Sequence, residues 1–285
     1  MLVFSCLVAG SFSLGGMAMK TEAITPLAFN SLRFAAATAA LGIIVLLTGG
    51  FPKKAASAPW RYVILGGLFA LYFVMMFAGL KTATPVSTSA VFTLTPVLSA
   101  IFGYALLRQI TTLRVALGLF VGALGALWVI FRADLSALMA FEVGRGEAIY
   151  FIGVVAHALY TPLVPKFNRG ERAFVFIFFI LLSSTLVMLG FGLPDILATN
   201  WLALPAIVWI TLFYTTFIAT TTTATLLTFA SVRLESAKVM AYTYLTPTWV
   251  ILWEIGLGHD VPPALTFIGI GLTILALYLL LKHEE

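Results

Sequence analysis

Long apolar stretches constrain this sequence more than any other feature. Runs of about 20 predominantly apolar residues recur along almost the whole chain, and a run of that length crosses the hydrocarbon core of a bilayer as an α-helix. Only 9% of the residues are charged, against about 25% in soluble domains. A soluble fold could not cover these runs with polar surface, so the sequence predicts an all-α integral membrane protein.

Turn-forming and charged segments mark the ends of the predicted spans. Such residues gather at 49–54, 82–85, 132–147, 166–172 and 258–263, and none of the intervening loops is long enough for a soluble domain. The first segment, 2–20, has no basic region before it and ends in Lys20, so we interpret it as a membrane helix and not as a signal peptide. Ten transmembrane helices are expected, at 2–20, 26–47, 60–80, 85–107, 111–131, 147–166, 172–192, 201–229, 235–257 and 262–281.

The basic residues predict the orientation of these spans. Lys and Arg near helix ends are retained on the cytoplasmic side. With the N-terminus inside, eleven of them fall in cytoplasmic segments and four on the opposite side, while Arg33 lies within the second span. We therefore expect both termini in the cytoplasm, in the plasma (inner) membrane of a prokaryote. The net charge of +5 follows from this orientation and requires no nucleic-acid partner.

An internal repeat divides the chain into halves. The segment AVFTLTP at 90–96 returns as AYTYLTP at 241–247, and at the same offset of 151 residues Gly118 matches Gly269 and Leu124 matches Leu275. Five helices in each half give the second copy the opposite orientation, as in the inverted repeats of secondary transporters, whose sites lie near the midplane. We expect repeats at 1–131 and 147–285, joined by a loop at 132–146, around a central cavity.

The two copies resemble a known family in their fourth and fifth helices. The stretches at 94–130 and 245–281 are similar to EamA-type transporters of the drug/metabolite transporter superfamily in their Pro96 and Pro247, in Asp260 before the last helix, and in the paired glycines named above. Arg33 also matches an Arg early in the family's second helix, whereas Gln109 stands where an acidic residue is usual. The resemblance implies a ten-helix transporter, with exporters of aromatic and other amino acids (the YddG type) as the most similar members.

The repeated proline suggests where the cavity lies. Proline within a membrane helix leaves a carbonyl without its donor, which is tolerated where protein groups or water satisfy it. One face of the fourth span carries Phe92 and Thr93 before Pro96, and the ninth carries Tyr244 before Pro247. Hydroxyls beside large apolar surfaces suit a small amphipathic solute. The alternative explanation for these residues is that the two helices are kinked and packed against their neighbours, with Thr hydroxyls bonded to the backbone of their own helix.

Three further spans carry candidate lining residues. His157 lies near the centre of the sixth span, and intramembrane ionisable residues are functional candidates; a neutral imidazole bonded to a carbonyl is the alternative. The eighth span is rich in Thr hydroxyls that could line the cavity, and contacts between helices are the alternative role for them. Gly118, Gly122 and Gly125 of the fifth span are expected to make close helix contacts only. The predicted substrate-binding residues are Tyr72, Phe92, Thr93, His157, Tyr160, Tyr214, Tyr244 and Pro247.

The expected function is secondary transport. We expect export of small amphipathic metabolites, foremost amino acids with aromatic or other neutral side chains, by alternating access. Export of other metabolites or drugs, such as nucleosides, remains an alternative, and a channel or an intramembrane enzyme is less favoured. No phosphate-binding loop or metal-site spacing is present in the sequence, so we expect neither a cofactor nor a metal. The expected partners are the solute and the lipid bilayer; a monomer is compatible with this architecture, and both proton antiport and facilitated export remain open.

Overall fold

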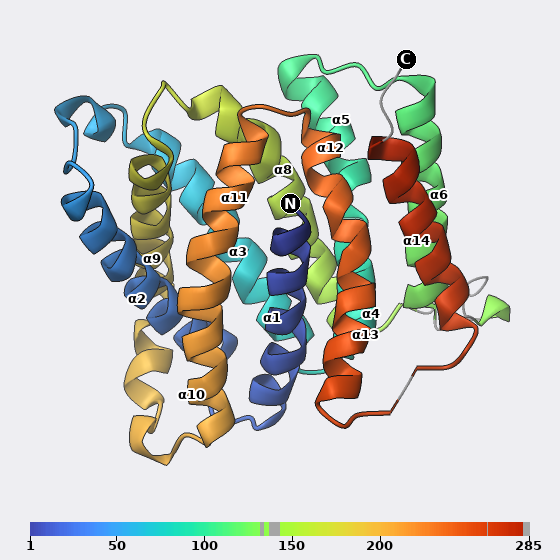
Figure 1. The fold of residues 1–285 in the computed structure, drawn as a ribbon. Helices are drawn as coiled ribbons and strands as arrows, with labels where there is room; N and C mark the ends of the chain where they lie inside the picture. The colour runs from blue at the N-terminus through green and yellow to red at the C-terminus, as the bar shows by residue number, and fades with distance from the viewer. Residues whose placement is uncertain (132–133, 137–142, 261, 282–285) are drawn as a thin grey trace.

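A computed structural model describes residues 1–131, 134–136, 143–260 and 262–281, and statements about the structure below refer to these residues. Within them the chain is helical and contains no β-strand (Figure 1). Eight helical stretches are long and apolar enough to cross a membrane. The prediction of an all-α, multi-pass membrane protein is therefore supported.

The first half begins with three helices of membrane-spanning length: α1 (Leu2–Lys20), α2 (Pro26–Leu47) and α3 (Trp60–Gly79). The expected fourth span is divided into α4 (Pro85–Phe92) and α5 (Thr95–Leu107), and α6 (Leu113–Ile130) completes this half. A short 3₁₀ turn, η1 (Lys53–Ala56), precedes α3. The threonines before α2, α4 and α6 each accept a backbone N–H through the side chain, which caps helices whose first turns would otherwise leave donors unpaired.

The second half begins with two long helices, α8 (Arg145–Phe167) and α9 (Ala173–Ala198). After the 3₁₀ turn η2 (Trp201–Ala203) comes a stretch made of α10 (Ala206–Phe213), the π-helical segment η3 (Tyr214–Thr220) and α11 (Thr221–Ser231). The chain then forms α12 (Ser236–Ala241), the 3₁₀ turn η4 (Tyr242–Leu245), α13 (Thr246–Gly256) and α14 (Thr266–Leu281).

The last two expected spans are less regular than the others. The span expected at 235–257 consists of α12, η4 and α13, and the span expected at 262–281 contains α14, which has 16 residues. Neither is among the eight stretches that are long and apolar enough to cross a membrane. Ten spans in two inverted repeats therefore remain a prediction.

Both repeated prolines lie in the first turn of a helix that follows a break. Pro96 is in the first turn of α5 and Pro247 in the first turn of α13, where a missing N–H costs no intrahelical hydrogen bond. At the first break Thr93 donates to the carbonyl of Ala90 and Thr95 to that of Phe92, at 2.6 and 2.5 Å. The hydroxyls there bond their own backbone, which agrees with the packed-kink alternative for this break.

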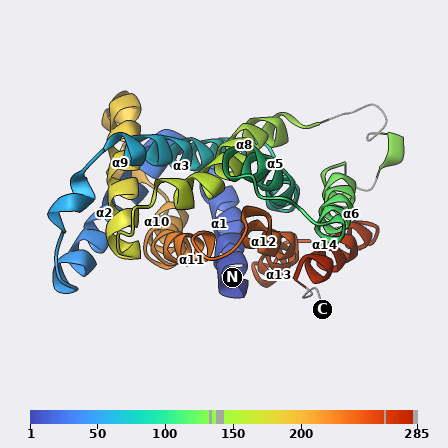
Figure 2. The same cartoon turned by 90° about the horizontal axis from the view of Figure 1, so that it is seen from above.

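The helices form an elongated bundle whose two ends are helix pairs from different halves. α2 packs on α9 at one end and α6 on α14 at the other, with α1 near the middle (Figure 2). At the α6–α14 contact, a Cβ on Gly125 would lie 2.6 Å from the Gly269 carbonyl oxygen. Gly118 and Gly122 are also closely covered, by α14 and by the Tyr244 ring. The prediction that the glycines of α6 make close helix contacts is confirmed.

Candidate functional site

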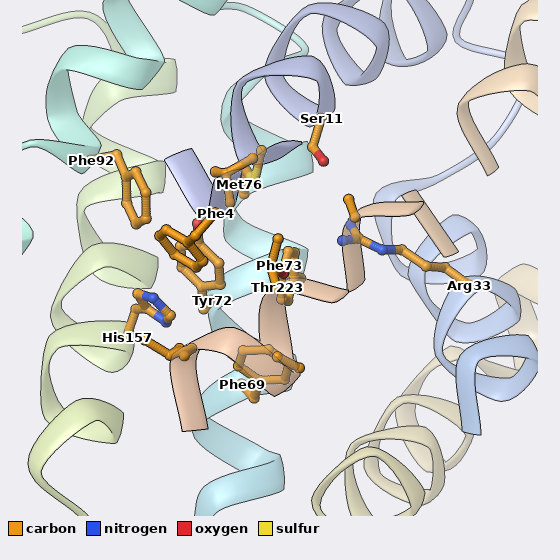
Figure 3. A pocket seen from close by; sticks show the side chains of 14 residues that line it. Phe4, Ser11, Arg33, Phe69, Tyr72, Phe73, Met76, Phe92, His157 and Thr223 are labelled. Atoms are coloured by element: carbon orange, nitrogen blue, oxygen red, sulfur yellow. The ribbon is translucent and has the colours of Figure 1, made fainter. Parts of the chain in front are cut away.

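A small pocket lies in the interior of the bundle, between helices of both halves (Figure 3). Side chains from α1, α2, α3, α4, α8, η3 and α11 contribute to its wall. Its volume is about 20 Å³, which is room for roughly one water molecule. The lining residues are Phe4, Val8, Ser11, Arg33, Phe69, Tyr72, Phe73, Met76, Phe92, His157, Ala219, Thr223, Ala224 and Leu227.

One face of α3 supplies much of the aromatic wall. Phe69, Tyr72, Phe73 and Met76 recur at the three- and four-residue spacing that places side chains on one face of a helix. The Tyr72 and Phe73 rings meet edge to face with their centroids 4.6 Å apart. The Tyr72 hydroxyl accepts a hydrogen bond from Tyr150 at 3.2 Å, which fixes its ring in the wall.

His157 of α8 stacks on this wall. Its ring centroid lies 4.3 Å from that of Tyr72 and 5.7 Å from that of Phe92. The side chain is only 2% exposed, and both ring nitrogens lack a hydrogen-bond partner. Unsatisfied buried polar atoms are uncommon and call for an explanation. The alternative in which the imidazole bonds a backbone carbonyl is therefore not what the structure shows.

Arg33 of α2 is the cation of the pocket. It is 1% exposed, its Nε donates to the Thr220 hydroxyl at 2.8 Å, and its Nη1 donates to the Asn30 side chain at 3.5 Å. Its Cζ lies 4.2 Å from the centroid of the Phe73 ring, a distance at which the ring face attracts a cation. No carboxylate in the described segments forms an ion pair with it. A buried charge without a counter-ion is costly, and a bound anion would lower that cost.

The π-helical segment η3 presents the partner of Arg33. A π-helical turn is rare and occurs often at functional sites. Here the Thr220 hydroxyl donates to the carbonyl of Thr215, five residues earlier, at 2.7 Å, so its lone pairs can accept from Arg33 Nε. The irregular turn therefore orients the guanidinium beside the pocket.

Comparison with known proteins identifies the family of this chain. The sequence profile of the EamA-like transporter family matches residues 1–131 and 144–282. The chain belongs to the EamA-like transporter family. The family points to membrane transport and away from catalysis.

Two further likenesses accompany the family match. This EamA-family protein is 29% identical over 172 residues to the uncharacterized transporter YyaM of Bacillus subtilis (strain 168), an alignment that covers 59% of this chain and 55% of that protein. The aligned part thus spans about half the length of the relative. A protein of known crystal structure shares the fold, with a TM-score of 0.70 and 18% identity over 98% of this chain and 94% of the other.

Three of the eight predicted site residues line the pocket of this EamA-family transporter. Tyr72, Phe92 and His157 contribute to its wall, and Tyr160 lies behind it, stacked on Phe69 with 5.0 Å between ring centroids. Sequence reasoning did not place Arg33 in the site. It is the one Lys or Arg more than three residues from either end of a predicted span, so the reasoning that made the intramembrane His157 a candidate also applies to Arg33.

The other four predicted residues lie outside the pocket wall. Thr93 bonds its own helix, and Pro247 is buried in the first turn of α13. The Tyr214 hydroxyl donates to the Leu7 carbonyl at 3.0 Å, which ties η3 to α1. The ring of Tyr244 fills the space over Gly122. In this conformation these four side chains serve contacts between or within helices.

The acidic residues closest to the spans lie at helix ends, away from the pocket wall. Glu147, in the first turn of α8, accepts a hydrogen bond from Ser87 at 2.6 Å. Glu254, near the end of α13, lies 2.9 Å from the His259 ring nitrogen. None of the residues that line the pocket in the described part of the chain is acidic.

An ion pair joins the two halves at the α8–α9 loop. Arg61, at the start of α3, donates to Glu171 at 2.8 Å and also to the Phe167 carbonyl. Burial alone would raise the pKa of the Glu171 carboxyl, but hydrogen bonds from Arg61 and from the backbone N–H of Arg169 outweigh it and hold that pKa below its ordinary value of 4.5. Glu171 is therefore charged at neutral pH and fixes this loop to α3.

Proposed function

We propose that this EamA-family protein is a secondary transporter that exports small amphipathic metabolites by alternating access. Amino acids with aromatic or other neutral side chains are the first class to test. The observation that carries the proposal is the buried pocket, in which aromatic rings of the first half adjoin Arg33, which has no counter-ion among the described residues, and the His157 imidazole, whose nitrogens have no hydrogen-bond partner. Sites for small molecules combine such apolar walls with a few oriented polar groups.

The proposed topology has ten spans, two inverted five-helix repeats and both termini in the cytoplasm, in the inner membrane of a prokaryote. Eleven basic residues against four support the orientation. The repeat is supported by the two matched stretches of the family profile and by the breaks before the helices that begin around Pro96 and Pro247. Labelling of engineered cysteines tests this topology.

The size of the pocket supports alternating access. A volume of about 20 Å³ is too small for an amino acid, whose binding needs a cavity on the order of 300 Å³ or more. The walls must therefore separate before a solute can enter. Because helices of both halves line the pocket, movement of one half against the other would open it, as in other transporters with repeats.

Transport by the purified protein in liposomes tests the proposal. We expect saturable uptake of at least one amphipathic metabolite from a panel of amino acids and nucleosides, with stimulation by the same solute on the far side. Unitary currents would indicate a channel. Absence of saturable uptake for the whole panel would contradict amino acids and nucleosides as the transported solutes. Because the wall contains no acidic residue among those described, uptake should proceed without a pH gradient, and strict dependence on one would favour proton antiport.

Two phenylalanine variants connect transport to the pocket. Phe92 is fully buried in the wall, whereas Phe120 on α6 is 62% exposed. Phe92→Ala should lower transport several-fold because the solute loses an aromatic contact, and Phe120→Ala removes a ring of the same size from the lipid-facing surface. Equal transport by the two variants, at equal protein level in the membrane, would show that this pocket does not bind the transported solute.

A further inference from the structure

We propose that the pocket selects aromatic monocarboxylates, with Arg33 binding the carboxylate, and that it discriminates against the matching amino acids. This inference rests on the proposed transport function and narrows its substrate class. It follows from the charges around the pocket and from the position of its aromatic wall between Arg33 and His157.

Charge balance is the first step. Arg33 remains charged in proteins, and no ion pair satisfies it among the described residues. Within the described segments its Nε and Nη1 donate hydrogen bonds to neutral oxygens. A guanidinium pairs with a carboxylate through two parallel N–H bonds, and such an anion would neutralise the pocket.

The ammonium group of an amino acid has no equivalent partner there. None of the described residues in the wall is Asp or Glu, and the cation already present repels a second one. A zwitterion would therefore bury an ammonium group without a counter-ion, at a cost that a monocarboxylate avoids. Ring faces attract cations more weakly than a carboxylate does, and the Phe73 face is already occupied by Arg33.

The shape of the site suits an aryl group attached to a short acid. Figure 3 shows Arg33 and His157 entering from opposite sides, with Tyr72 and Phe73 between them. A carboxylate at Arg33 would place an attached ring against this aromatic wall once the helices separate. His157, with both nitrogens unpartnered, could then meet a hydroxyl or ring N–H at the far end of the solute.

Three ligands with one skeleton test the inference. The full-length protein in detergent is titrated with 3-phenylpropionate, phenylalanine and 2-phenylethylamine, followed by calorimetry. We expect 3-phenylpropionate to bind on the order of tenfold or more tighter than phenylalanine, since a charge-assisted pair is gained without a buried ammonium. The amine should bind weakest. Equal or tighter binding of phenylalanine would overturn the inference.

Variants of Arg33 separate anion binding from packing. Arg33→Gln should lose on the order of tenfold or more in affinity for 3-phenylpropionate and should lose the preference over phenylalanine. Arg33→Lys should keep the preference with weaker binding, because a point charge replaces the fork. Arg233→Gln is the matched control, since Arg233 lies near the end of α11 and outside the pocket wall. Unchanged affinity and preference in Arg33→Gln would overturn the inference.

Counterflow in liposomes distinguishes failure of this inference from failure of the proposed function. Tight binding of 3-phenylpropionate without movement of any solute would contradict transport and leave the anion site standing. Saturable transport of phenylalanine, with 3-phenylpropionate neither bound nor competing, would keep the transporter and refute the acid-selective site.

Discussion

The crossing of α3 and α9 offers a sharp test of how closely these helices pack. Gly66 of α3 faces α9, and a Cβ at this position would lie 2.8 Å from the Ile180 carbonyl oxygen and from the Ser184 backbone nitrogen. The next residue, Gly67, has no neighbour within 4 Å of its Cβ position. Gly66→Ala and Gly67→Ala therefore add the same methyl group to the same helix, in the first case against α9 and in the second case into open space.

The structure sets the size of the expected difference. Ordinary Cβ contacts begin at about 3.4 Å, so α3 and α9 would have to move apart by roughly 0.6 Å. The obstructing atoms are two backbone atoms and the Cβ of Ser183, none of which can turn aside. Overpacking of this kind costs about 1–3 kcal/mol. Separation would also lengthen the 2.9 Å hydrogen bond from the Ser184 hydroxyl to the Gly66 carbonyl, worth about 0.6 kcal/mol in membranes. Both variants gain about 0.8–1.0 kcal/mol of helix propensity, which cancels in the comparison.

Unfolding of the two variants in mixed micelles, titrated with SDS and followed by circular dichroism, measures this difference. We expect the free energy of unfolding of Gly66→Ala to lie about 1–3.5 kcal/mol below that of Gly67→Ala. Gly67→Ala should match or exceed the unaltered protein. If Gly66→Ala were as stable as Gly67→Ala, the close α3–α9 contact would not exist in the folded protein.

Three other predictions follow from the same structure. In a Cys6→Ser background, Arg169→Cys should resist an impermeant thiol reagent added to intact cells, whereas Leu202→Cys should react with it. Both positions are exposed, but they lie at opposite ends of α9 and so on opposite sides of the membrane. The reverse labelling pattern would invert the proposed orientation. Because the folded pKa of Glu171 is depressed, its contribution to stability should be complete above the ordinary pKa of about 4.5 and disappear as the pH falls through the lower folded value. Glu171→Gln should therefore flatten the acid limb of a stability–pH curve, and an unchanged limb would contradict this. His157→Gln should retain part of the transport and His157→Leu lose most of it, since of these two side chains only the amide can offer a solute the hydrogen bonds that the imidazole could make. Full activity of the Leu variant at equal membrane level would make the ring a packing residue.

The lengths of the apolar runs and the turn-forming residues between them were sufficient to locate the long helices. Apolar runs bounded by Pro, Gly and basic residues gave α1, α2 and α3 to within a residue. The eighth and ninth expected spans were harder, because the backbone leaves the α-helical form at η3 and η4. A π-helical or 3₁₀ turn shifts which side chains share a face, so counting by regular helical steps does not hold across such a turn.

The predicted residues that line this pocket lie on α-helix, whereas two of those outside it lie in irregular turns. Tyr72 and His157 lie on uninterrupted stretches of α3 and α8, and both line the pocket. Tyr214 and Tyr244 lie within η3 and η4 and contact neighbouring helices. No local pattern shows that Arg33 lacks a carboxylate, because that depends on residues from other helices, which only the tertiary structure brings near it.

The pairing of α6 with α14 has a consequence for biogenesis. The glycine face of α6 finds its partner in the last helix of the described chain, more than one hundred residues later. During synthesis the part of this face that contacts α14 therefore stays without that partner until α14 has been made. An insertion intermediate that ends before α14 carries a surface suited to another small-residue helix, so the first half of the protein completes its packing only when α14 arrives.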